Sequence, residues 1–120
     1  MIEWPTRVRV GWADYALLPY AAHEATSKGN FGEHNSLTME MRYDSALSAQ
    51  RQAHTILHEL THAIRASLWL SGFWETAKAQ EPDKAEETIA SGIADGFACV
   101  IRDNSDLWIA LGAALTKEPT

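Results

Sequence analysis

A helix-forming stretch near the middle of the chain carries the pattern that most constrains the fold. Apolar residues recur there at helical spacing, at Ala53, Ile56, Leu57, Leu60, Ala63 and Ile64. This spacing predicts an amphipathic helix with Leu60 facing the core. Within it, residues 58–62 read His-Glu-Leu-Thr-His. Because positions four apart lie on one helix face, His58 and His62 should project side by side, on a face other than that of Leu60.

The polar residues of this motif are typical of a zinc site. Two imidazoles one helical turn apart can hold one Zn²⁺, and Glu59 can take a proton from a metal-bound water. A pair of merely structural histidines is the alternative, but the helical setting and a suitable acidic third ligand favour the metal. We expect Zn²⁺ to be bound by His58 and His62, with Glu59 as the general base.

A third protein ligand is expected, because a catalytic zinc site keeps three ligands and one open position. An acidic residue on a helix packed against the motif helix would serve, which points to residues 84–102. On that helix Glu86 lies on the same side as the apolar stripe, whereas Glu87 is offset from the stripe. The two histidines are offset in the same way from the apolar stripe of their own helix. We therefore expect Glu87 to be the ligand, with Glu86 as the runner-up. The alternative for either residue is a first-turn carboxylate that interacts with the helix dipole.

The order of the expected elements is strands first and helices after, which predicts an α+β fold. We expect a single domain over residues 1–120, with a small N-terminal antiparallel sheet packed on a zincin-like helical core. The expected elements are a strand at 7–10, a polar turn-forming stretch at 21–35, a strand at 36–43, a helix from Asp44 or Ser45 to about Leu70, a connector at 72–83, a helix from about Lys84 to Arg102, and a last helix, Leu107–Leu115, capped by residues 104–106.

Composition narrows the classes of partner. The formal net charge is −6, and acidic and basic residues are interspersed, which argues against direct binding of nucleic acid. The single cysteine, Cys99, excludes an internal disulfide, and its apolar surroundings predict a small buried side chain. No signal-like start and no long apolar run occur, so we expect a cytoplasmic protein without a membrane span. Gly92 and Gly96 predict a close helix–helix approach.

Two segments resemble the ImmA/IrrE-like zinc metallopeptidases, especially their short single-domain members from phages and prophages. Residues 55–64 carry the HExxH helix, and residues 86–94 match a pattern close to E-x-x-x-N-x-x-A. Glu87, Ser91 and Ala94 fall on the Glu, the Asn and the Ala, with Ser91 departing from the usual Asn. The resemblance implies a gluzincin-type endopeptidase that hydrolyses a protein or peptide substrate, with Zn²⁺ as cofactor.

Further residues are candidates for supporting roles in such a site. A Tyr, His or Arg usually stabilises the oxyanion, and His23, His34 and Tyr43 are possible, with none singled out by spacing. His54, one turn before the motif, is expected on the helix surface, although it could face the cleft. The strand Leu37–Tyr43 resembles the edge strand on which such enzymes lay an extended substrate.

Two other functions stay open. One is a zinc-stabilised binding or accessory protein of phage or prophage origin, since a small domain can draw folding energy from zinc. The other is an interaction protein whose motif is vestigial. Glu59 favours the enzyme, because a purely structural zinc site has no need of a general base.

Overall fold

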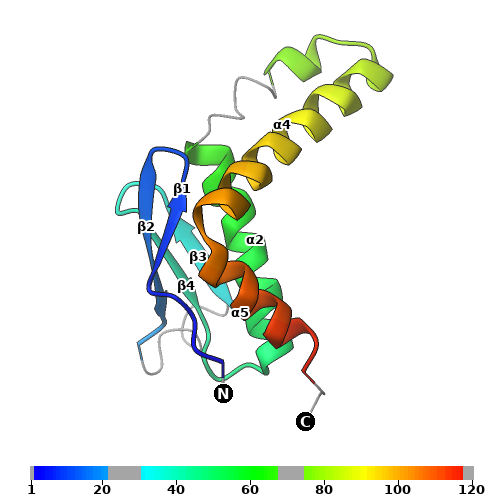
Figure 1. Ribbon diagram of the computed structural model, residues 1–120. Coiled ribbons are helices and arrows are strands. Elements are labelled where there is room, and N and C mark those ends of the chain that lie inside the picture. The colour runs from blue at the N-terminus through cyan, green and yellow to red at the C-terminus, as the bar shows by residue number, and fades with distance from the viewer. Residues whose placement is uncertain (1, 22–30, 68–74, 118–120) are drawn as a thin grey trace.

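The computed structural model describes residues 2–21, 31–67 and 75–117, in which strands precede helices as predicted. The elements are β1 (Arg7–Val10), β2 (Ala13–Pro19), β3 (Gly32–Asn35), β4 (Glu40–Tyr43), α2 (Ala49–Ser67), α4 (Pro82–Asp103) and α5 (Ser105–Leu115). Helix α2 packs on β3 and β4, α5 packs on α2, and α4 packs on β1 (Figure 1). The fold is therefore α+β, with helices segregated from the strands.

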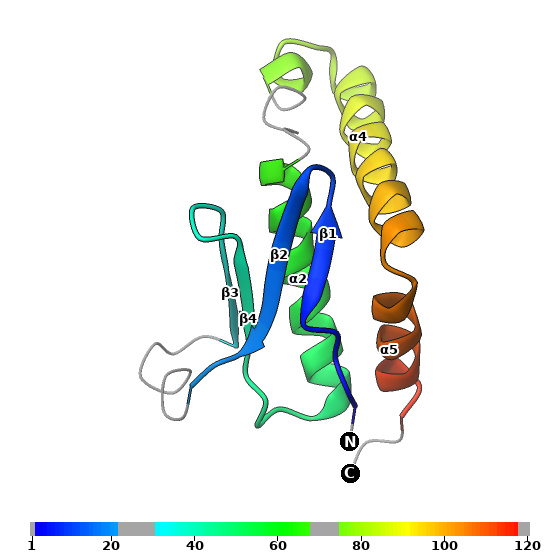
Figure 2. The ribbon, with the colours of Figure 1, turned by 60° about the vertical axis from the view of Figure 1, so that its left-hand side comes forward.

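The four strands form one mixed sheet in the order β1-β2-β4-β3 (Figure 2). β1 and β2 form an antiparallel hairpin, and β3 and β4 are also antiparallel, but β2 and β4 run parallel. The prediction of an antiparallel sheet is therefore wrong for the central pair of strands, β2 and β4. The reason is topological: β4 returns from the outer strand β3 and joins β2 in the same direction.

Strand β3 lies inside the stretch 21–35 that was predicted as turn, and this prediction is wrong for Gly32–Asn35. The four residues are polar and show no apolar alternation, so only their backbone pairing with β4 makes them a strand. β3 is also an outer strand of the sheet, whereas β4 lies between β2 and β3. The predicted substrate-binding edge strand, 37–43, is thus an inner strand, and the outer strand beside α2 is β3.

The predicted strand 36–43 is shorter than expected. Residues 36–39 form a turn in which Met39 has a φ of 54°, and only Glu40–Tyr43 pair. Leu37, in this turn, is 93% exposed. The left-handed backbone at Met39 breaks the alternation that the sequence pattern implied.

Helix α2 buries the stripe that the sequence predicted. Ala53, Ile56, Leu60, Ala63 and Ile64 are all at most 1% exposed and pack in one core with sheet residues such as Val8, Tyr15, Leu17 and Met41. Each large apolar side chain buried in this way contributes about 1.5–3 kcal/mol. Because this face of α2 is buried, His58 and His62 lie on another face of the helix, which is exposed.

The helix begins a turn later than predicted. The backbone N–H of Arg51 donates to Ser48 Oγ over 3.3 Å, so Ser48 takes the cap position. Asp44 instead accepts a hydrogen bond from Ala46 N in the preceding turn. The predicted helix end near Leu70 lies outside the described residues.

Helix α4 agrees with its prediction to within two residues at each end. Gly92, Gly96 and Val100 are buried, and Ile93 and Phe97 pack against the core, whereas the apolar side chain of Ile101 is 51% exposed. Cys99 is half-buried, which corrects the prediction of a buried side chain. No helix in the described residues is long and apolar enough to cross a membrane.

Asn104 ties the junction of α4 and α5 to the outer side of β1. Its Oδ1 accepts from Arg9 N over 2.7 Å, and its Nδ2 donates to Arg9 O over 2.7 Å and to Val100 O over 2.8 Å. The predicted role of residues 104–106 as a side-chain cap of the last helix is not seen at Asn104. Its side-chain amide instead forms hydrogen bonds with the backbone N–H and C=O of Arg9 at the edge of the sheet.

Candidate metal centre

His58 and His62 lie side by side on α2, as their spacing predicted. Their Nε2 atoms are 3.3 Å apart, and their rings meet edge to face with centroids 5.0 Å apart. A tetrahedral Zn²⁺ with Zn–N bonds near 2.05 Å holds two nitrogens about 3.3–3.4 Å apart. Both rings are exposed to solvent. The two nitrogens therefore lie close enough to hold one metal ion between them.

Glu59 lies close to the two histidines and forms a group of three with them. One ligand atom each of His58, Glu59 and His62 lie within 4.8 Å of one another, and no other group of three or more such residues occurs in the part of the chain that the structure describes. The Glu59 side chain is only 7% exposed. Burial raises the pKa of its carboxyl, the two histidines lower it in part, and the Glu33 carboxylate adds to the rise. A buried carboxylate thus stands beside an exposed imidazole pair.

Gly32 on β3 lets the sheet approach this carboxylate closely. A Cβ at Gly32 would overlap Thr55 Cγ2 and would lie 2.9 Å from the Arg42 carbonyl oxygen and 3.3 Å from Glu59 Cγ. Glycine is therefore required by space. The sequence pattern predicts only a turn at Gly32, because the partners of this glycine are set by strand pairing.

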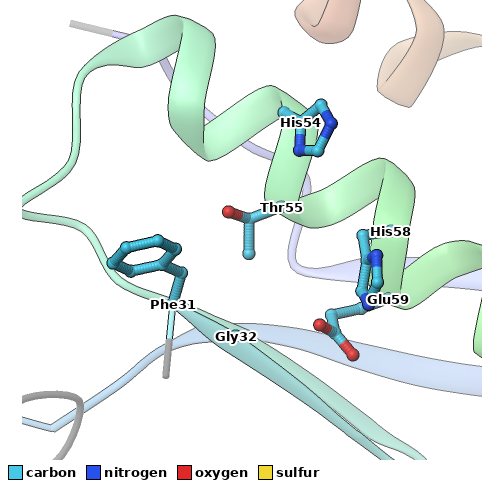
Figure 3. Close-up of a pocket in the computed structure, with 6 residues that line it drawn as sticks. All are labelled: Phe31, Gly32, His54, Thr55, His58 and Glu59. Carbon is cyan, nitrogen blue, oxygen red and sulfur yellow. The ribbon is translucent and has the colours of Figure 1, made fainter. Parts of the chain in front are cut away.

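Two cavities border the histidine pair along α2. The first, about 260 Å³, lies between α2 and β3 and is lined by Phe31, Gly32, His54, Thr55, His58 and Glu59 (Figure 3). His54 is exposed on the helix surface, as expected, and also lines this cavity. The second, about 290 Å³, lies one turn further along and is lined by His34, His62, Arg65 and Ala66. The group of three is thus reachable from both sides, beside an outer strand of the sheet.

His34 joins the site from β3. Its ring stacks on that of His62, with centroids 6.2 Å apart and an interplanar angle of 14°. Its Nε2 is 3.0 Å from the Tyr15 hydroxyl, which in turn accepts a hydrogen bond from Ser67 Oγ over 3.1 Å. Burial and the charge of His62 lower the pKa of His34. Sequence reasoning named His34 among several candidates and missed Tyr15 and Ser67, whose placement depends on tertiary packing.

The remaining candidates lie elsewhere. Glu86 and Glu87 are both exposed in the N-terminal half of α4, which runs beyond the end of α2 (Figures 1 and 2). Glu87 does not belong to the group around His58, and its ligand role stays a prediction. Tyr43 is a core residue in edge-to-face contact with Trp4, and burial raises its pKa. His23 lies outside the described residues.

Comparison of the chain with protein-family models, with curated proteins and with solved structures gave no match.

Proposed function

We propose that this protein is a zinc-dependent metallopeptidase that hydrolyses a peptide bond of a protein or peptide substrate. The observation that carries the proposal is the group of His58, Glu59 and His62: two Nε2 atoms at zinc-binding separation, with a buried carboxylate within 4.8 Å. A structural zinc site has no use for such a carboxylate unless it is itself a ligand.

The metal would supply polarisation of the scissile carbonyl and acidification of a water towards a pKa of about 7. Glu59 would take the proton from the attacking water and deliver it to the leaving amine. Its burial beside Gly32 limits the positions that the carboxylate can adopt. A base held in this way is ready for both proton transfers.

The outer strand β3 supports an extended peptide as substrate. It lies next to α2 and pairs with β4 on one side only, within the described sheet. A peptide added alongside β3 would pass the histidine pair, and its side chains would reach the cavities at Phe31 and at Arg65. The proposed substrate strand is therefore β3 rather than the stretch 37–43.

Glu87 is the proposed third ligand. The support is its place in the E-x-x-x-N-x-x-A-like pattern and its exposed carboxylate near the start of α4. Coordination by Glu87 requires the N-terminal half of α4 to approach α2 more closely than in Figure 1. Metal binding and closure of α4 should therefore be coupled.

A second function has one observation in its favour. Glu59 lies close enough to the histidines to be a ligand itself. If it coordinates the metal, no base is left, and the domain is a zinc-stabilised binding protein.

The Glu59→Gln variant separates the two functions, because glutamine keeps the size of the side chain and removes the base. For a peptidase, zinc content should stay at one ion per chain while hydrolysis of peptides selected from a quenched-fluorescence library falls by about 10²–10⁴-fold. Loss of zinc from this variant would support the binding protein. Wild-type activity with zinc retained would refute the peptidase mechanism.

A further inference from the structure

Three hydrogen-bonding side chains connect α2, β2 and β3 next to the histidine pair. Ser67 on α2 and Tyr15 on β2 are 3% and 1% exposed, and buried hydroxyls of this kind need partners. Ser67 Oγ donates to the Tyr15 oxygen over 3.1 Å. If the Tyr15 oxygen accepts from Ser67 in this way, its own O–H is left to donate to His34 Nε2, 3.0 Å away.

This direction of hydrogen bonding sets the tautomer of His34. A neutral imidazole has one donor and one acceptor nitrogen. With Nε2 accepting from Tyr15, a neutral His34 ring carries its proton on Nδ1. The ring is half-buried and lines the 290 Å³ cavity together with His62. Its stacking on His62, with centroids 6.2 Å apart, places the ring of His34 next to the metal-binding pair.

His34 is beside the metal-binding group but not a member of it. A neutral donor that stands outside the ligand set and is held by buried partners has the properties of an oxyanion stabiliser, since a fixed donor needs no reorganisation as charge develops. We propose that His34 donates a hydrogen bond from Nδ1 to the carbonyl oxygen of the scissile bond as it becomes negative, and that Tyr15 and Ser67 are the positioning residues for His34. This role rests on the proposed peptidase function.

The tautomer gives a test that needs no substrate. Long-range ¹H–¹⁵N NMR spectra of the zinc-loaded protein should show the His34 proton on Nδ1. Tyr15→Phe removes the hydroxyl alone and should shift the tautomer equilibrium of His34 towards Nε2–H. Ser67→Ala provides a second, milder perturbation if the tyrosine variant folds poorly. An Nε2–H ring in the wild type would overturn the proposal, because Nδ1 would then be an acceptor.

Kinetics test the role itself. With a peptide that the wild type cleaves, His34→Ala should lower kcat by about 10²–10³-fold, with KM and zinc content unchanged. His34→Asn keeps an amide N–H near the position of Nδ1 and should recover part of the loss. Tyr15→Phe should lower kcat less than His34→Ala does, because it misorients the ring without removing it.

The outcomes separate this role from the proposed function. Loss of zinc from His34→Ala would make His34 a ligand and overturn the proposal, and so would a wild-type kcat in that variant. A wild type that holds zinc and cleaves no peptide would overturn the peptidase function, and the oxyanion role with it. An active wild type with an active His34→Ala variant would overturn the oxyanion role alone.

Discussion

Replacing Gly32 with alanine tests the close approach of β3 to α2 on which the site is built. The added Cβ would overlap Thr55 Cγ2 and would lie 2.9 Å from the Arg42 carbonyl oxygen. Thr55 is 7% exposed but lines the 260 Å³ cavity, so a change of its rotamer can relieve only the overlap with the methyl group. The Arg42 carbonyl belongs to the backbone of a paired strand and cannot move by a change of rotamer. The remaining strain must therefore be taken up by a shift of the β3 backbone relative to β4.

Overpacking of a well-packed interior costs about 1–3 kcal/mol, and the backbone contact places Gly32→Ala in the upper part of that range, at about 2–3 kcal/mol. For a chain of 120 residues this corresponds to a fall of about 8–12 °C in the unfolding temperature. Urea unfolding of the metal-free protein, followed by tryptophan fluorescence, measures the free energy directly. Adding Thr55→Ser removes the overlapping methyl group and should restore about 1 kcal/mol.

Gly112→Ala is the matched control. A Cβ at Gly112, in α5, meets no atom within 4 Å. Alanine should therefore stabilise the helix by about 0.5–1 kcal/mol. A wild-type free energy of unfolding for Gly32→Ala, or a gain in stability like that of Gly112→Ala, would contradict the lack of space for a side chain at Gly32.

Three further substitutions test the sheet edge, the core and the proposed third ligand. Asn104→Ala leaves the Arg9 backbone at the sheet edge without its partner and should cost about 2–4 kcal/mol in urea unfolding; a cost under about 0.5 kcal/mol would contradict the role of this amide. Leu60→Ala empties a fully buried position and should cost about 3–4 kcal/mol by the same measurement, whereas a near-neutral result would contradict its place in the core. Glu87→Ala should weaken zinc binding by at least about tenfold in calorimetric titration, while Glu86→Ala should bind as the wild type does; the reverse order would assign the ligand to Glu86.

The helices could be predicted from the sequence because their signals are local. The apolar stripe of α2 recurs every three to four residues, and Leu60 is buried as that period requires. The HExxH spacing also predicts the histidine pair, since two positions on one regular helix have a fixed separation. The geometry at His58 and His62 follows from helix geometry and needs no tertiary information.

Strand β3 and the surroundings of the histidine pair could not be predicted from the sequence, because they depend on contacts between segments that are distant in the chain. Nothing in the polar sequence of Gly32–Asn35 indicates a strand, because its pairing with β4 supplies the structure. The approach of Gly32 to Glu59 and the hydrogen bonds of Tyr15 exist only once the sheet has packed on α2. Glu87 poses the same difficulty, since a helix period predicts which face carries a carboxylate but not how far α4 lies from α2.

Zinc titration of the metal-free protein tests the central claim most directly. Calorimetry should show one Zn²⁺ per chain for the wild type and for His54→Ala, whose exposed histidine lies one turn before the pair. The His58→Ala/His62→Ala double variant should fold, because both side chains are exposed, and should show no such binding. Stoichiometric zinc binding of wild-type affinity by the double variant would contradict the metal site and the function proposed for it.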